Sequence, residues 1–303
     1  STQVETAMQT LGYKSKRSSV SFQPTVVALI GAADNTYFAE IVAGIQDRAG
    51  RNGILVNIVV NQKEPDFSSR FCRWIIRTAP FGLILCISNA IPDEDLIRIR
   101  ATSNIPIVAI NKPAKVTDIP TIRIDYERAM ERVVRHILQF KHRRIAFLNG
   151  FENSYSSKAK RIGVQNALEK LGYHLADELH EERASTVEGG FQAMNILFSL
   201  PKERQPTAVI ASSDQMALGA MHSIRSRGLS IPGDMTVVGF DDISMAAHAN
   251  PPLTTISPPK FEIGERAMQL LLANQEGESS VRDEYLIMES PLIVRESSGP
   301  CPD

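Results

Sequence analysis

The sequence has few of the features that mark secreted or membrane proteins. It contains three cysteines, Cys72, Cys86 and Cys301, an odd and scattered set without the spacing of a disulfide framework or a metal site. No apolar run approaches the ~20 residues that a membrane-spanning helix needs, and no signal peptide precedes the first predicted strand. We therefore expect reduced thiols in a cytoplasmic protein without membrane attachment.

The chain also has almost no net charge. Its 33 Lys and Arg residues nearly balance 34 Asp and Glu residues, which gives a formal net charge of −1. Such a balance makes no overall electrostatic case for binding nucleic acid or an anionic membrane. Residues 1–19 are the exception, because Lys14, Lys16 and Arg17 there face only Glu5.

The motifs of the common α/β enzymes are missing as well. No G-x-G-x-x-G follows the first predicted strand, and there is no G-x-x-x-x-G-K-[ST] loop, G-x-S-x-G elbow or H-E-x-x-H helix. The six histidines lack the spacing of metal ligands. We therefore predict no enzyme, no metal and no cofactor, and expect a binding protein.

Short apolar runs alternate with amphipathic segments along most of the chain. TVVALI at residues 25–30 predicts a strand and YFAEIVAGIQDRAGRNG at 37–53 a helix, and the alternation continues through ILVNIVV and FSSRFCRWIIRTA. It starts again after residue 125 with DYERAMERVVRHILQF and RRIAFLNG. This pattern predicts two α/β units in series, each with a parallel sheet covered by helices on both faces.

The first residues form a short amphipathic pattern of their own. Val4, Ala7, Met8 and Leu11 have the spacing of one apolar stripe of a helix, and Gly12 can end it. An isolated helix of roughly ten residues is unstable in water. This segment therefore needs a partner to pack on.

Polar side chains follow several of the predicted strands. Asp34 and Asn35 follow the first strand, Asp125 follows TIRI, and Asp241 follows MTVVGF. In open α/β sheets, ligands bind beyond the carboxyl ends of the strands. Carboxylates beside the aromatic pair Tyr37–Phe38 suit a sugar or a nucleobase, because they accept its hydrogens while the rings stack.

Two of these residues have a second interpretation. Asn35 and Asp125 each stand directly before a predicted helix, where they would serve equally well as N-caps. Asp241 is the strongest single candidate for a ligand contact, because Asp242 and Ser244 are available to cap whatever follows it.

Three segments resemble the LacI/GalR family of bacterial transcription regulators. They are YFAEIVAGIQDRAGRNG, SSDQMALGAMHSIRSRGLSIPGDMTVVGFDD and PPLTTI. The last two are highly specific for this family. The resemblance extends from about Thr25 to Glu296. It implies an α/β fold like that of type I periplasmic binding proteins, with two Rossmann-like, parallel-sheet subdomains joined by three crossovers. By analogy these crossovers fall near residues 141–144, 251–253 and 276–280.

The resemblance divides the chain into three parts. Residues 1–24 correspond to a remnant of the helix-turn-helix headpiece and hinge, because V-x-x-A-x-x-x-L-G-Y resembles the last headpiece helix. Residues 25–141 plus 253–279 correspond to the N-terminal effector subdomain, and residues 142–252 plus 280–297 to the C-terminal one.

The DNA-binding elements are only partly represented. The recognition helix is missing from this sequence, and KSKRSSVSFQP does not match the usual hinge helix. Lys14, Lys16 and Arg17 could contact phosphates. We expect no sequence-specific operator binding by the chain as given, because base readout needs the recognition helix.

The resemblance also implies an effector site, position by position. Lys160 stands where sugar-binding members place an arginine, although a slip of one residue would put Arg161 there. Ser185 stands where family members often have an aromatic residue that covers the ligand, and Ser213 where they often have an asparagine. The resemblance therefore does not imply that this chain shares the lactose or the purine specificity of those members. The predicted effector-binding residues are Asp34, Asn35, Tyr37, Phe38, Asp125, Ser154, Ser156, Lys160, Arg161, Ser185, Ser213 and Asp241.

The function implied is that of a ligand-responsive, DNA-binding transcriptional regulator, and specifically a repressor. Its effector would be a small metabolite such as a sugar, a nucleoside or a purine. The alternative is a solute-binding protein of a sugar transporter with the same fold. The absent signal peptide, the thiols and the first helix favour the regulator. Its expected partners are the effector, operator DNA in the full-length protein and a second copy of the chain.

A homodimer is expected because two-fold dimers read paired half-sites on DNA. The helix SDQMALGAMHSIRSRG at 213–228 has an apolar arc wider than one face needs, which fits either a dimer contact or deep burial. The family dimerises through this helix, through the segment at 243–250 and through a helix of the other subdomain. The predicted interface residues are Phe71, Trp74, Met221, Ile224, Met245 and His248.

Overall fold

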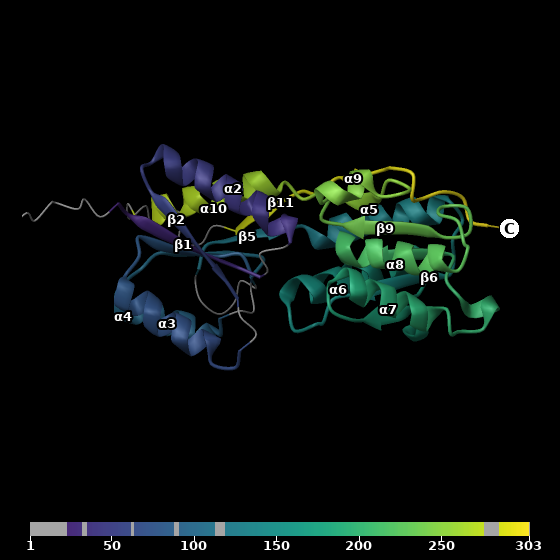
Figure 1. Ribbon diagram of the computed structural model, residues 1–303, viewed down its shortest axis with the longest axis horizontal. Helices are drawn as coiled ribbons and strands as arrows, with labels where there is room; N and C mark the ends of the chain where they lie inside the picture. The colour runs from purple at the N-terminus through teal and green to yellow at the C-terminus, as the bar shows by residue number, and fades with distance from the viewer. Residues whose placement is uncertain are drawn as a thin grey trace, which may run out of the picture.

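The computed structural model describes residues 23–31, 35–61, 64–87, 91–112, 119–275 and 285–302. They form two α/β lobes that lie side by side along the longest axis of the molecule (Figure 1). The predicted fold class is confirmed. The predicted first helix, the basic residues Lys14, Lys16 and Arg17, and the site residue Asp34 lie outside the described residues.

The first lobe is built on a six-stranded parallel sheet with the order β11-β5-β4-β3-β1-β2. Helices α2 and α10 pack together on one face of the sheet, and α3 and α4 cover the other face (Figure 1). The elements of this lobe are β1 (Thr25–Ile30), α2 (Thr36–Arg51), β2 (Leu55–Val60), α3 (Phe67–Thr78), β3 (Gly82–Leu85), α4 (Asp93–Ser103), β4 (Ile107–Ile110), β5 (Thr121–Ile124), α10 (Lys260–Gln275) and β11 (Tyr285–Met288).

The second lobe has the strand order β12-β10-β9-β8-β6-β7, parallel except for β12 at one edge. Helices α5 and α6 pack together, and α7 and α8 form a second pair (Figure 1). Its elements are α5 (Tyr126–Gln139), β6 (Ile145–Asn149), α6 (Tyr155–Lys170), η1 (Asp177–Leu179), β7 (His180–Glu182), α7 (Val187–Leu197), η2 (Lys202–Arg204), β8 (Ala208–Ala211), α8 (Asp214–Ser226), β9 (Thr236–Phe240), α9 (Ser244–His248), β10 (Thr254–Ile256) and β12 (Leu292–Ile293).

Strand β1 shows why continuous apolar runs form these sheets. Val26, Ala28 and Ile30 join the core beneath α2 and α10, whereas Val27 and Leu29 join the core beneath α3 and α4. Successive side chains of a strand point to opposite faces, so a strand covered on both faces must be apolar throughout. The predicted strand at 25–30 is confirmed.

The chain crosses between the lobes at other places than the sequence led us to expect. Helix α5 packs against α6 and β12, so the first crossing lies at Asp125, before α5, and not at 141–144. A helix with one apolar stripe can cover either sheet. Hydrophobic periodicity alone therefore does not say to which lobe α5 belongs.

The second and third crossings also differ from the expected places. Strand β10 pairs with β9, so the chain crosses at 257–259 and not at 251–253. Strand β11 pairs with β5, so the chain returns at 289–291 and not at 276–280. An apolar run in the sequence identifies a strand. It does not show which neighbouring strand it pairs with, because that depends on the whole sheet.

No helix within the described ranges is long and apolar enough to cross a membrane.

Two glycines allow α2 and α10 to approach closely. A Cβ atom at Gly44 would lie 2.0 Å from the carbonyl oxygen of Phe261, and one at Gly264 would lie 2.0 Å from that of Ile41. Both obstacles are backbone atoms, which cannot rotate away as a side chain can. The contact between these two helices therefore depends on glycine at both positions.

We predict that Gly44→Ala lowers the free energy of unfolding by about 1–3 kcal/mol, the usual cost of overpacking a core. Gly50→Ala in the same helix is the matched control, because a Cβ there meets nothing within 4 Å. Alanine should stabilise that position by up to ~1 kcal/mol through helix propensity. Urea denaturation of both variants measures the difference, and equal stabilities would contradict the close approach.

Candidate functional site

A cavity of about 210 Å³ lies between the two lobes, at the carboxyl ends of their strands. The first lobe contributes the start of α2 and the residues that follow β3 and β4. The second lobe contributes the starts of α5 and α6 and the residues that follow β8 and β9. The cavity is lined by Asn35, Tyr37, Phe38, Cys86, Ile87, Ile110, Asn111, Tyr126, Ser154, Ser156, Ser157, Lys160, Ser185, Ser212, Ser213 and Asp241.

Three helices begin at this cavity with a cap that also lines it. The Asn35 side chain accepts a hydrogen bond from the Tyr37 backbone N–H, that of Ser154 from Ser157 N–H, and that of Ser213 from Met216 N–H. Helix N-termini carry partial positive charge and favour electron-rich ligand atoms. For Asn35, capping and lining the cavity are therefore compatible roles.

Lys160 places a buried ammonium group in the cavity wall. Its Nζ donates to the Ser212 carbonyl oxygen at 2.7 Å and lies 3.8 Å from the Phe240 ring centroid. Burial lowers the pKa of Lys160, while the carboxylates of Asp241 and Asp214 oppose this effect. The residue therefore supplies a hydrogen-bond donor and a cation–π contact in a dry environment.

Asp241 directly follows β9 and is the partly buried carboxylate of the cavity. Burial raises its pKa from 3.8 to about 6, and the neighbouring Lys160 and Lys260 oppose the rise. Its φ is +113°, a region that costs a non-glycine residue about 1–3 kcal/mol. Strained residues persist where the surroundings hold them, and they cluster at functional sites.

Aromatic rings form the remaining wall. Tyr37 and Phe38 meet edge to face, with centroids 5.3 Å apart, and Tyr126 lies 5.8 Å from Phe240. Burial raises the pKa values of the Tyr37 and Tyr126 hydroxyls, so both stay neutral and can donate as well as accept. Burial also raises the pKa of the Cys86 thiol to about 12, which makes it unreactive.

Comparison with known proteins shows what this arrangement is similar to. Residues 134–298 match the family described as Periplasmic binding protein-like domain. The chain is 31% identical to the HTH-type transcriptional repressor CytR of Escherichia coli K12 over 299 residues, which are 97% of this chain and 84% of CytR. The chain belongs to the LacI family of transcription regulators.

Solved structures of this family share the fold. The Lac repressor dimer bound to operator and the anti-inducer ONPF has a TM-score of 0.80 at 24% identity, covering 97% of this chain and 98% of that one. The transcriptional regulator CelR in complex with cellobiose has a TM-score of 0.82 at 24% identity, covering 97% of this chain and 89% of that one.

Nine of the twelve predicted effector residues line the cavity, and their contact with an effector stays a prediction. Asp125 does not line it. Its carboxylate caps α5 by accepting from the Arg128 N–H at 3.0 Å. Arg161 does not line it either, because its guanidinium pairs with Glu152 and donates to Gln165 at 2.8 Å. Lys160, and not Arg161, faces the cavity.

Several lining residues were not predicted. Asn111 and Ser212 follow the apolar runs IPIVAI and TAVIA, so the rule that identified Asp241 could have identified them too. Tyr126 stands next to Asp125 at the start of α5, and no sequence signal distinguishes it from an ordinary first-turn residue. Cys86, Ile87, Ile110 and Ser157 complete the set.

The predicted dimer residues divide between core and surface. Ile224 and Phe71 are buried in the cores of their own lobes, because each faces its sheet, so neither is available to a partner. Trp74 is half-buried against Phe71. A surface groove of about 490 Å³ lies between α8 and α9. Its lining includes Leu218, Met221, His222, Arg225 and Met245.

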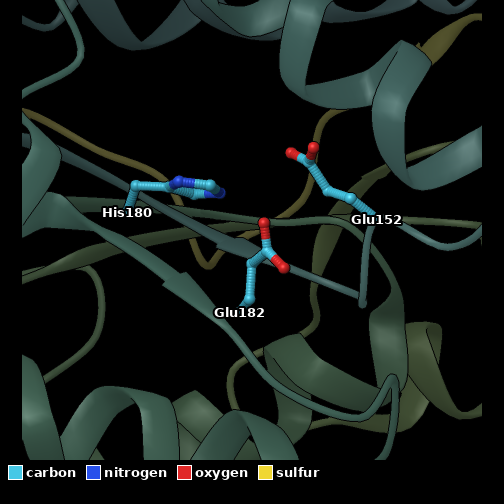
Figure 2. A group of neighbouring side chains, drawn as sticks. All are labelled: Glu152, His180 and Glu182. Carbon is cyan, nitrogen blue, oxygen red and sulfur yellow. The ribbon is translucent and has the colours of Figure 1, made fainter.

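Glu152, His180 and Glu182 form a separate cluster beside β6 and β7 (Figure 2). Their ligand atoms lie within 4.8 Å of one another, and His180 Nε2 is buried without a hydrogen-bond partner. These three side chains could hold a divalent cation. The Glu152 carboxylate, however, already pairs with Arg161, whose positive charge opposes a cation there. We assign no metal to this cluster.

We predict that Asp241→Asn stabilises the unliganded protein at pH 7.5. Because the folded-state pKa is raised, ionising Asp241 destabilises the fold as pH increases from about 4 to about 6. A rise from 3.8 to about 6 corresponds to at most roughly 3 kcal/mol. Asparagine keeps the shape of the side chain and tolerates positive φ.

The free energy of unfolding of this variant should exceed that of the wild type by about 1–3 kcal/mol at pH 7.5 and match it near pH 4. Denaturant unfolding at both pH values measures this. A variant that is less stable at pH 7.5 would contradict the cost assigned to this carboxylate.

Proposed function

We propose that this protein is a cytoplasmic transcriptional repressor whose affinity for operator DNA is controlled by a small polar metabolite bound between its lobes. The observation that carries this proposal is the shared cavity. Tyr37, Phe38 and Asn111 reach it from the first lobe, and Lys160 and Asp241 reach it from the second. A ligand that touches both sets stabilises one arrangement of the lobes over others.

The chemistry of the cavity favours a neutral ligand with several hydroxyl or amine groups. The Asp241 carboxylate accepts hydrogen bonds, the Lys160 ammonium donates them, and the serine hydroxyls do both. Tyr37 and Phe38 offer faces on which a sugar or a base can pack. A volume of about 210 Å³ lies below the ~300–1,000 Å³ of drug-sized pockets and favours a monosaccharide or a nucleoside.

The alternative, a solute-binding protein of a transporter, is not favoured. A relative with 31% identity across 97% of the chain is a transcriptional repressor. The Lac repressor structure with operator and anti-inducer gives a precedent for DNA and a small molecule acting on one dimer of this fold.

We predict that a thermal-shift screen with ribose, cellobiose, adenosine, cytidine and guanine identifies a stabilising compound. At 100 times its Kd, a ligand that binds only the folded state adds about 2.7 kcal/mol. Asp241→Ala should then weaken binding of that compound by ~1.5–3 kcal/mol, the contribution of a charged hydrogen bond in a closed cleft. Tyr37→Ala should cost less if the ring only stacks.

Asp125→Ala is the matched control for Asp241→Ala. It removes a carboxylate that caps α5 outside the cavity, so it should lower stability and leave the Kd of the compound unchanged. Wild-type affinity in Asp241→Ala, measured by calorimetry, would show that the effector binds elsewhere.

We predict a homodimer that buries the groove between α8 and α9. Met245 is 55% exposed at this groove, and apolar side chains at the centre of an interface carry much of its binding energy. Met245→Asp should raise the dissociation constant by several orders of magnitude in sedimentation equilibrium. Met221 is buried beside it, so a charge there would also destabilise the lobe.

Ile162→Asp is the control for this interface, because Ile162 is similarly exposed but lies on α6. It should leave the dimer intact. A monomeric wild-type chain at micromolar concentration would refute the proposed assembly.

A further inference from the structure

Lys260 is a buried lysine close to the cavity, although it does not line it. It is the first residue of α10, directly after the second crossing, and its side chain is only 3% exposed. Burying an ammonium group costs several kcal/mol unless its charge is paired and its protons are hydrogen-bonded. The partners of Lys260 therefore show what this residue does.

Three oxygen atoms surround the ammonium group. Lys260 Nζ donates to the backbone carbonyl oxygens of Asp241 at 2.6 Å and Asp242 at 2.7 Å, and it lies 3.3 Å from Glu40 Oε1. The ammonium group therefore donates two of its three protons to carbonyl oxygens and forms an ion pair with Glu40. Two of the oxygens belong to the second lobe and one belongs to α2 of the first.

The two carbonyl groups belong to a strained turn. Asp241 has a φ of +113° and Asp242 a φ of +47°, and such conformations cost non-glycine residues about 1–3 kcal/mol each. In this turn both carbonyl oxygens approach one point, where they repel each other unless a cation is present. The Lys260 ammonium converts this repulsion into two charge-assisted hydrogen bonds.

The ion pair with Glu40 is the weaker contact. The Glu40 side chain is 47% exposed, and pairs with one exposed partner contribute little. The two carbonyl contacts are shorter, at 2.6 and 2.7 Å, and part-buried, and they therefore dominate. This difference lets one substitution separate the two contacts.

We propose that Lys260 is the positioning residue of the effector site, because it holds the Asp241–Asp242 turn in the conformation that directs the Asp241 carboxylate into the cavity. This assignment rests on the proposed function for its biological meaning. The contact itself can be tested without any effector.

The charge of Lys260 acts on Asp241 together with that of Lys160, and both oppose the rise in the pKa of Asp241 that burial causes. Asp214 of α8 is neutral near pH 6, because burial raises its pKa to about 8, and the Asp242 carboxylate pairs with Arg295 at 2.7 Å. Among the described residues, the hydroxyls of Tyr37 and Tyr126 also interact with Asp241, and burial keeps both neutral. Removing Lys260 should therefore leave Lys160 as the main charge that stabilises the ionised form of Asp241.

The first experiment titrates Asp241 in the unliganded protein. With ¹³C at the aspartate carboxyl carbons and Asp241→Asn to assign the signal, the wild type should titrate with a midpoint of about 6. Lys260→Met should raise this midpoint by about one pH unit or more, as expected for loss of a neighbouring unit positive charge. Lys202→Met, an exposed lysine in η2, should leave it unchanged.

Lys260→Arg is the conservative variant, because a guanidinium group retains the charge and can donate to both carbonyl oxygens. It should keep the midpoint within a few tenths of a unit of the wild type. A merely structural lysine would lower stability in both variants without moving the midpoint. An unchanged midpoint in folded Lys260→Met overturns the proposal.

The second experiment measures binding of ribose, cellobiose, adenosine, cytidine and guanine to the same variants. A compound that binds the wild type should bind Lys260→Met at least tenfold more weakly and Glu40→Gln within about twofold. Equal affinities for wild type and Lys260→Met would overturn the positioning role and leave the proposed function intact. If none of the five binds the wild type, the proposed effector class fails, while the titration still decides the role of Lys260.

Discussion

The cavity depends on keeping one carboxylate charged where the surrounding protein removes much of its hydration. Asp241 is partly buried, and desolvation alone would leave it protonated well above the usual pH range of an aspartic acid. The ammonium groups of Lys160 and Lys260 oppose this, the first from α6 and the second from α10. Because α10 packs in the first lobe and Asp241 follows β9 of the second, the charge of this carboxylate depends on how the lobes are placed.

Several residues of the cavity have two roles at once. Asn35, Ser154 and Ser213 cap helices and line the cavity, so side chains that start the helices also form the cavity wall. Because one side chain serves both roles, the sequence alone could not separate capping from ligand binding at Asn35. Asp125 was predicted to bind the effector on the same pattern. It caps α5 at the first crossing but does not line the cavity.

Much of the secondary structure could be predicted, because burial on both faces of a sheet makes a strand apolar throughout. β1 is such a strand. β7 was missed because its sequence is HEE, at the sheet edge and only partly buried. The crossings were placed by analogy with the family and were wrong, and hydrophobic periodicity could not correct them because it does not reveal which sheet a strand joins. Whether Lys160 or Arg161 enters the cavity depends on a ~100° rotation about the helix axis, which a helical pattern defines only loosely. Nothing in the sequence indicates Lys260, since its main partners are backbone carbonyls whose directions depend on the fold.

The direction of β1 places a limit on how this protein can transmit a signal. The cavity lies at the carboxyl end of the sheet, whereas the chain enters the first lobe at Thr25, at the opposite end of β1. Six residues of strand separate the two ends by roughly 20 Å. A molecule in the cavity therefore does not contact Thr25 directly. Any effect on Thr25 has to pass along β1, which the parallel pairing with β2 and β3 makes a stiff connection between the cavity and the start of the lobe.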